Sequence, residues 1–347
     1  MRNNSQPTVS FGVFDHLDEA GGSLRQQYTD RLQIAAACDL AGFRAYHVAE
    51  HHGTPHGMAG SPNLFLSAVA QRTTRMRIGP LVMLLSLYHP LRAFEEICML
   101  DQLSGGRLDL GIGRGAVPLE LSFFGVSIDQ AQGLYSEAVD IVLQAMDADM
   151  LSYDGRYFKL DNVPITLSPF QRPHPPLWYG TSKSETALWA AENNINIACI
   201  GPSSAIRTMT DAYRSRWNAT SVESDSMPLL GMVRTVVIAD TNAEANAIAA
   251  PAYARWLKTF THLSHSRGLP APPNLPPSFE QALDEGHCLV GSASTVRDAL
   301  KRQVSEAGVT YVMCHLAFGD LPLAASLDTI SAVQSKIMPA FSGVQFA

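Results

Sequence analysis

The chain has 347 residues, of which 46% are hydrophobic and 16% are charged, and its formal net charge is −7 at pH 7. This composition supplies enough apolar side chains for a large core and too few charges for a disordered chain. Because no long basic run is present, nucleic acid and anionic membranes are not expected as partners.

The N-terminal residues and the cysteines indicate in which cellular compartment the protein is expected. The first ten residues, MRNNSQPTVS, are polar and do not resemble a secretory signal, and no apolar run approaches the roughly 20 residues of a membrane helix. The five cysteines are odd in number, far apart and without a C-x-x-C pair. This spacing favours reduced thiols over a disulfide framework or a zinc knuckle, so we expect a cytoplasmic protein.

Strand-like and helix-like segments alternate from the start of the chain. The apolar patterns predict strands at 8–14, 43–49, 76–84 and 107–113, with helices at 24–41, 61–73 and 89–104 between them. Ser61 followed by Pro62 is typical of a helix N-terminus. After Ser127 the patterns predict strands at 175–180, 195–200, 232–239 and 309–316, and helices at 130–147, 184–194, 203–217, 242–260 and 325–339.

Two segments interrupt this alternation. Residues 151–169 contain a D-G turn between aromatic residues, which predicts a hairpin insertion. Residues 261–290 are rich in proline and show no clear strand, which is typical of a mobile, lid-like loop.

Eight strands alternating with helices predict an α/β fold, a (β/α)8 TIM barrel, as a single domain over residues 1–347. A doubly wound open sheet is the alternative. Its dinucleotide-binding fingerprint, G-x-G-x-x-G, is incomplete, because GIGRGA at 111–116 lacks the third glycine.

Active sites of such barrels lie at the carboxyl ends of the strands, so the residues just past each strand are the candidates. Within AYHVAEHHGTPHG (45–57), Glu50, His51 and His52 follow the second strand. An imidazole beside a carboxylate suits acid–base chemistry, and a solvated polar loop is the alternative. A metal ion is not expected, because adjacent histidines point in different directions and rarely share one ion.

A second candidate is a phosphate site past the fourth and fifth strands. Ser182 with Glu185 three residues later predicts a capping box, and free amides and hydroxyls at a helix start also bind phosphate. Arg114 lies in the glycine-rich turn 111–115, where its guanidinium is a good bidentate phosphate partner. Simple helix capping and a structural ion pair of Arg114 are the alternatives.

Several motifs in fixed order carry a resemblance to a known family. VAEHH (48–52), SPNLFLSAVA (61–70) and RMRIGPLVMLLSLYHPLRAFEEICMLDQLSGGRLDLGIGRG (75–115) strongly resemble bacterial luciferase and its relatives, the luciferase-like flavin-dependent monooxygenases. The resemblance implies a TIM-like barrel that binds FMN, delivered as reduced FMN by a separate flavin reductase. It further implies that the flavin reacts with O2 to a C4a-peroxyflavin, which oxygenates a small organic, apolar carbonyl-type substrate.

The resemblance also assigns residues. His51 is similar to the family's active-site histidine, and we expect Glu50 to orient it. Arg114 resembles the phosphate-binding arginine, with a hydroxyl group at the helix start, from Thr181, Ser182 or Ser184. The Leu81–Val82 peptide, followed by Met83, lies where relatives have a non-proline cis bond under the isoalloxazine. The helix carrying Glu95 and Glu96 matches a subunit-interface helix, which implies a homodimer.

One departure and two alternatives remain. Gly113 stands where luciferase has a reactive cysteine, which argues against light emission rather than against the family. An F420-dependent hydride-transfer enzyme has the same barrel, but the long acidic tail of F420 favours more basic residues than Arg114 and Lys183 at the mouth. A non-enzymatic flavin-binding protein is the other alternative; such relatives lack strands that this chain retains.

Overall fold

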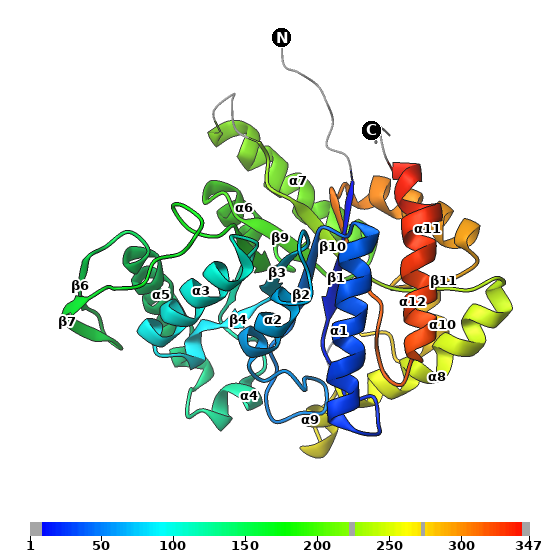
Figure 1. Cartoon of the computed structure of the whole chain (residues 1–347), viewed down its shortest axis with the longest axis horizontal. Coiled ribbons are helices and arrows are strands. Elements are labelled where there is room, and N and C mark those ends of the chain that lie inside the picture. Colours follow the sequence, from blue (N-terminus) through cyan, green and yellow to red (C-terminus); the bar gives the residue numbers. More distant parts are fainter. Residues whose placement is uncertain (1–8, 222–225, 272–274, 342–347) are drawn as a thin grey trace, which may run out of the picture.

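Eight parallel strands form the centre of the molecule and close almost completely into a barrel (Figure 1). The computed structural model describes residues 9–221, 226–271 and 275–341. The barrel strands are β1 (Ser10–Asp15), β2 (Ala45–Val48), β3 (Arg77–Pro80), β5 (Leu110–Gly113), β8 (Leu177–Gly180), β9 (Asn196–Cys199), β10 (Leu230–Ile238) and β12 (Tyr311–His315). They follow the order β3-β2-β1-β12-β10-β9-β8-β5, and a parallel bridge between Ile78 and Leu108 joins the two ends. The predicted TIM barrel is confirmed.

Two further strands extend this ring. β4 (Met83–Leu84) comes shortly after β3 and pairs with β5, with Met83 opposite Ile112. β11 (Cys288–Gly291) pairs with the second half of β10, with Cys288 opposite Thr235. The sequence did not predict β11, because its four residues are too short for a period-2 pattern to stand out.

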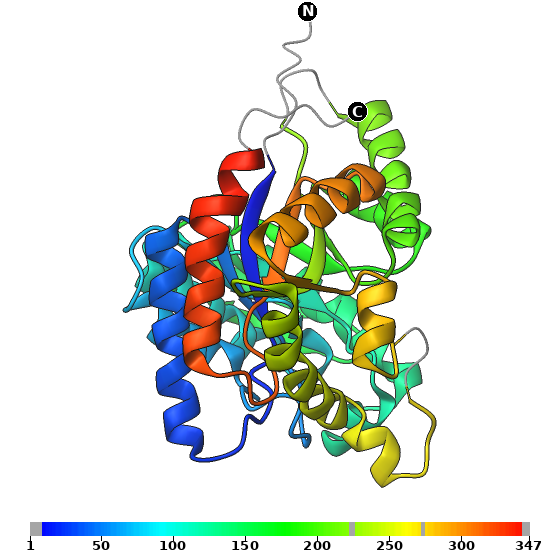
Figure 2. The same ribbon diagram turned by 90° about the vertical axis from the view of Figure 1, so that its right-hand side faces the viewer.

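Helices surround the strands, and α1 and α12 lie side by side on one flank (Figure 2). The helices are α1 (Leu24–Ala41), α2 (Pro62–Ala70), α3 (Pro90–Ser104), α4 (Pro118–Phe123), α5 (Ile128–Ala145), α6 (Ser184–Glu192), α7 (Ser203–Thr220), α8 (Asn242–Phe260), α9 (His262–Ser266), α10 (Phe279–Asp284), α11 (Ala293–Ala307) and α12 (Leu323–Ala332). Short turns of other helix types are η1 (Leu85–Leu87), η2 (Val333–Ile337) and η3 (Met338–Phe341).

Helix α1 illustrates why the ends of some helices can be predicted from the sequence. The Ser23 side chain accepts the backbone N–H of Gln26, which satisfies one of the free donors at the helix start. At the other end Gly42 adopts φ 83°, and its backbone N–H bonds the last carbonyls of the helix. The predicted range 24–41 is therefore the observed one.

The hairpin insertion is confirmed. β6 (Met150–Asp154) and β7 (Lys159–Pro164) pair antiparallel and project from the barrel (Figure 1). Glu137 of α5 accepts the backbone N–H groups of Arg156, Tyr157 and Phe158 at 2.8–3.1 Å. These bonds fasten the turn of the hairpin to the helix beneath it.

The segment 261–290 is not the single long loop that the sequence predicted. It contains α9, α10 and β11, while residues 272–274 lie outside the described residues. Ser278 accepts the backbone N–H of Gln281 and so starts α10 immediately after the proline pair. Helix and strand therefore alternate in the described part of this segment too.

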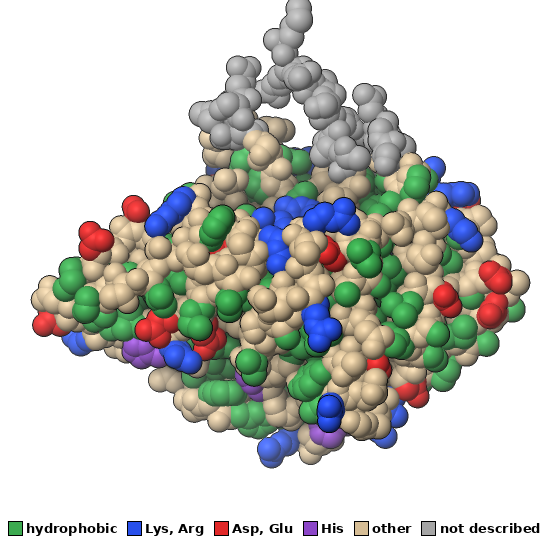
Figure 3. Space-filling model, in the orientation of Figure 1, with side chains coloured by type: hydrophobic (Ala, Val, Ile, Leu, Met, Phe, Trp, Pro, Cys, Tyr) green, Lys and Arg blue, Asp and Glu red, His purple; other side chains and the backbone are tan. Residues whose placement is uncertain are grey.

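The outer surface carries charged side chains of both signs, spread over the face shown in Figure 3. Among the helices of the described residues, none is both long enough and apolar enough to cross a membrane.

Candidate active site

The carboxyl ends of the barrel strands lie at the lower end of the molecule in Figure 1, beside α4 and α9. The residues that follow β1, β2, β5, β8 and β12 converge there because parallel strands all end at the same rim.

His51 is held by a carboxylate from another segment. Its Nδ1 lies 3.1 Å from Glu120 Oε1, and Glu120 Oε2 accepts the backbone N–H of His52 at 3.1 Å. Glu120 lies in the first turn of α4 and is buried, whereas the His51 side chain remains 24% exposed. A carboxylate can only accept, so Nδ1 donates this hydrogen, and in the neutral form of the ring Nε2 carries the lone pair.

The expected pairing of Glu50 with His51 is wrong. Glu50 is buried, and its Oε1 is bonded to His52 Nε2 at 2.8 Å and to the Tyr88 hydroxyl at 3.1 Å. Its Oε2 accepts the backbone N–H of Leu84 at 3.0 Å. Glu50 therefore fastens the loop after β2 to β4 and to the segment after η1, and Glu120 takes the place expected of it beside His51.

Arg114 and Thr181 lie at matching positions on neighbouring strands. β5 and β8 pair with Leu110 opposite Leu177 and Gly111 opposite Trp178, and Arg114 and Thr181 each come directly after their strand. Within the described residues, the recorded hydrogen bond of the Arg114 side chain is a long one, from Nε to the Gly115 carbonyl at 3.4 Å. An ion pair that would make Arg114 structural is not found among these residues, and its terminal nitrogens remain available for an anion.

The expected capping box at Ser182 is wrong. Helix α6 begins at Ser184, and Lys183 is the residue at its N-cap, without a side-chain capping bond. Thr181 Oγ1 instead accepts the backbone N–H of Lys183 at 3.2 Å and donates to the Lys183 carbonyl at 3.0 Å. Thr181 thus shapes the turn, while Ser182 is exposed and Ser184 is partly buried at the first helical position.

The peptide between Leu81 and Val82 is cis, as the resemblance implied. Leu81 and Met83 are buried and Val82 is partly exposed. A side chain at Gly113 would overlap the Val82 Cγ2 atom, so glycine at this position lets β5 approach the Leu81–Val82 segment closely.

Three histidines from two loops form a cluster at the mouth. One ring nitrogen from each of His16, His51 and His56 lies within 4.8 Å of the other two. His315 adjoins them, with its ring centroid 5.1 Å from that of His16. Trp256 and Phe260 of α8 cover the cluster, at 6.0 Å and 4.6 Å from the His56 centroid.

Burial sets the charge state of these rings. Desolvation, with smaller contributions from the neighbouring imidazoles, lowers the pKa of His16 and of His56 well below the ordinary value. Desolvation also lowers the pKa of His315 to about 4. The three rings are therefore neutral near pH 7 and can serve as acceptors or ligands.

The sequence analysis missed Glu120, His16 and His315. His16 and His315 were within reach of its own rule, because one directly follows β1 and the other ends β12. Glu120 carried no such signal, since α4 is only six residues long and lies two turns beyond β5. Which histidine it meets is decided by the path of the loop.

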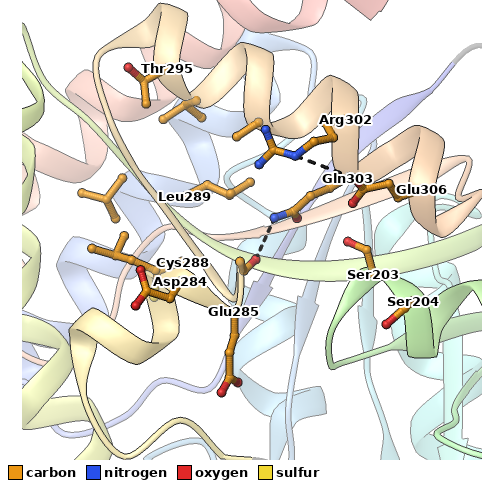
Figure 4. Close-up of a pocket in the computed structure, with 15 residues that line it drawn as sticks. Ser203, Ser204, Asp284, Glu285, Cys288, Leu289, Thr295, Arg302, Gln303 and Glu306 are labelled. Atoms are coloured by element: carbon orange, nitrogen blue, oxygen red, sulfur yellow. Dashed lines mark hydrogen bonds and ion pairs between the residues drawn. The ribbon is translucent and has the colours of Figure 1, made fainter.

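A separate cleft of about 430 Å³ opens between α7, α10, β11 and α11 (Figure 4). Acidic Asp284, Glu285 and Glu306 line it, and Arg302 lies 3.7 Å from Glu306. Gln303 donates from Nε2 to the Gly286 carbonyl at 3.1 Å. None of the predicted site residues lines this cleft, so it is not the candidate active site.

The family profile described as luciferase-like monooxygenase matches residues 9–311. The chain belongs to the luciferase-like monooxygenase family. It is accordingly a flavin-dependent oxidoreductase of the monooxygenase type.

Relatives within this family are similar over most of their length. The uncharacterized protein y4wF of Sinorhizobium fredii is 53% identical over 338 residues, which cover 97% of this chain and 99% of that protein. The oxygenase component of flavin-dependent trigonelline monooxygenase from Acinetobacter baylyi is 22% identical over 310 residues, which cover 84% and 85%.

Solved structures of luciferase-like proteins share the fold. Monooxygenase RslO1 from Streptomyces bottropensis aligns with a TM-score of 0.86 at 24% identity, covering 96% of this chain and 100% of that chain. The oxygenating constituent of 3,6-diketocamphane monooxygenase from Pseudomonas putida, in complex with FMN, gives 0.82 at 20% identity, covering 96% and 98%. The F420-dependent tetrahydromethanopterin reductase from Methanopyrus kandleri gives 0.67 at 18%, covering 96% and 99%.

Proposed function

We propose that this chain is the oxygenase component of a two-component system, which takes reduced FMN from a separate reductase and uses O2 to oxygenate a small apolar, carbonyl-type compound. The observation that carries the proposal is one rim that bears Arg114 and Thr181, at the ends of two paired strands, together with the His51–Glu120 pair. The first pair suits an anionic group and the second suits proton chemistry.

The residues at the mouth fit FMN. Arg114, Lys183 and the amides at the start of α6 are donors for a phosphate monoester. Beside them, a Cβ at Gly180 would meet no atom within 4 Å, so open space adjoins the donors. The Leu81–Val82 segment, called the ledge below, presents an apolar surface on which the ring system of a flavin can lie.

The protein's own contribution is binding, orientation and exclusion of water. Reduced flavin, when bound, supplies the oxygen-activating chemistry. Arg114 and the α6 start hold the phosphate, His51 holds or moves a proton at Nε2, and Glu120 fixes the ring that does so. Glu50 stabilises the surroundings of the site through its hydrogen bonds to the His52 ring and to the Leu84 backbone N–H.

F420 is the competing cofactor, since a structural neighbour of this chain uses it. Its longer acidic tail would need further cations along the mouth. Among the residues singled out at the strand ends, Arg114 and Lys183 are the basic ones, which favours the single phosphate of FMN.

Three further assignments belong to this proposal. A flavin reductase is the expected partner, because the trigonelline enzyme is named as an oxygenase component.

A homodimer would use α3, on which Met99 and Leu103 are exposed apolar residues near Glu95. All five cysteines are free thiols, which suits the cytoplasm.

The cofactor assignment is tested by anaerobic titration of the purified chain with reduced FMN and, separately, with reduced F420, following flavin or deazaflavin fluorescence. We expect reduced FMN to bind at least tenfold more tightly. Tighter binding of F420 would contradict the proposal and favour hydride transfer.

A further inference from the structure

The histidine cluster at the barrel mouth has unpaired ring nitrogens that the proposed flavin chemistry does not use. His16 Nδ1 and His56 Nε2 are buried and have no hydrogen-bond partner among the residues that the structure describes. Buried polar atoms are nearly always paired with protein, water or a ligand. The two rings are neighbours, with centroids 4.2 Å apart, so their unpaired nitrogens point to a group that binds beside both rings.

The hydrogen bonds around the cluster decide what kind of group this is. Glu120 accepts from His51 Nδ1, so the hydrogen of the neutral ring is on Nδ1 and the lone pair is on Nε2. Thr259 donates its hydroxyl hydrogen to the Trp256 carbonyl, so toward His56 Nδ1, at 3.5 Å, it can only accept. His56 therefore also presents a lone pair at Nε2.

A group that meets several lone pairs is a cation or a hydrogen-bond donor, and a carbonyl oxygen is excluded. Histidine ligands of metal ions usually donate their other ring N–H to a carboxylate or another oxygen, as His51 does to Glu120 and His56 does to Thr259.

The spacing of the three rings fits one small ion. Their ligand nitrogens lie within 4.8 Å of one another, so each would move by less than about 1 Å to reach the 2.0–2.1 Å bonds of zinc. Imidazole ligands without a direct carboxylate suit zinc-like ions and not magnesium or calcium. The partly exposed His51 gives the ion a path from the mouth.

We propose that, in the flavin-free chain, His16, His51 and His56 form a three-histidine site for one divalent transition-metal ion of the zinc type, with Glu120 and Thr259 orienting two of the ligands and the fourth position open. An ion on His51 Nε2 excludes the proton role proposed for that atom, so the metal-bound and flavin-bound states are alternatives. The sequence analysis rejected a metal because it paired His51 with His52. The structure instead turns His52 toward Glu50 and brings in His16 from the end of β1.

The test uses the purified, flavin-free full chain after dialysis against a chelator. Calorimetric titration with Zn²⁺ measures stoichiometry and affinity, and visible absorbance on adding Co²⁺ reports the coordination geometry. We expect one ion per chain and the intense visible bands of four-coordinate cobalt. Because flavin is absent, this result is independent of whether the chain oxygenates anything.

Variants assign the ligands. His16→Gln and His56→Gln should each weaken zinc binding by about 100-fold or more, and Glu120→Gln, which perturbs the orientation of a ligand, by about 10- to 100-fold. His174→Gln, which lies before β8 at the opposite end of the barrel, is the matched control and should leave the affinity unchanged. If one of these variants does not fold, the rise in melting temperature of the others on adding Zn²⁺ gives the same comparison.

The absence of stoichiometric binding, or equal binding by the wild type, His16→Gln and His56→Gln, would overturn the proposal. The lone pairs would then serve a hydrogen-bond donor on the substrate.

Discussion

Glu120 Oε1 lies 3.1 Å from His51 Nδ1, although 68 residues separate the two in the chain. The bond fixes which nitrogen of His51 faces outward, and the second Glu120 oxygen holds the backbone of His52. A short helix after β5 thereby determines the orientation of the ring that follows β2.

The first prediction concerns this pair. Glu120→Ala frees the His51 ring and leaves the His52 amide without its acceptor, so protection of reduced flavin from direct oxidation should weaken by about 10- to 100-fold. The measurement is the rate at which O2 reoxidises protein-bound reduced FMN. Glu306→Ala, at an exposed position on α11, is the control and should behave as wild type.

The second prediction concerns Arg114. Loss of charge-assisted hydrogen bonds to a phosphate costs about 1.5–3 kcal/mol, so Arg114→Ala should weaken reduced FMN by about 10- to 100-fold while riboflavin, which lacks the phosphate, is unaffected. Anaerobic fluorescence titration measures both ligands. Arg72→Ala is the matched control, because that arginine is exposed just after α2. Equal losses for FMN and riboflavin would remove Arg114 from the phosphate site.

The third prediction concerns the contact between Gly113 and Val82. A methyl group at Gly113 would overlap Val82 Cγ2, so Gly113→Ala should displace the ledge and weaken FMN by about tenfold or more. Val82→Ala removes the obstructing atom, and the double variant Gly113→Ala/Val82→Ala should recover most of the affinity. If the double variant binds no better than Gly113→Ala, the overlap is not the cause.

The fourth prediction concerns acid stability. Desolvation lowers the pKa of His47 to about 4, below its ordinary value of 6.5. The unfolded chain therefore takes up this proton first as the pH falls, and stability that is complete above about 6.5 is lost progressively toward 4. This one group should cost about 2 kcal/mol between pH 7 and pH 5.

Urea denaturation at pH 7 and pH 5 measures this loss. His47→Gln, which keeps a polar partner for the Tyr311 hydroxyl, should lose less stability than wild type over that interval. His89→Gln, at an exposed histidine, should follow the wild-type curve. An unchanged pH dependence in His47→Gln would show that His47 is not the titrating group.

The sequence predicted the barrel well because strand and helix periods are local. The range of α8 was predicted as observed because Thr241 caps it through the Glu244 amide. The start of α6 at residue 184 was also predicted as observed, but the cap expected at Ser182 was wrong, because Thr181 forms the turn and leaves Ser182 exposed. Adjacent polar residues compete for such roles, and only the loop geometry selects one.

The site was predicted in its positions and only partly in its contacts. The strand-end rule identified Glu50, His51, Arg114 and Thr181, because parallel strands end at one rim. It did not show that Glu50 turns to His52, or that Glu120 and His16 come to His51. Those contacts depend on side-chain directions and on loop paths, which residue spacing does not encode.

The central claim is that this chain holds reduced FMN and directs its reaction with oxygen. The most direct measurement is stopped-flow absorbance of the protein preloaded anaerobically with reduced FMN and mixed with oxygenated buffer. We predict an absorbance phase that precedes the appearance of oxidised FMN, and slower reoxidation than that of the free flavin. Reoxidation with the rate and single phase of free reduced FMN would contradict the account.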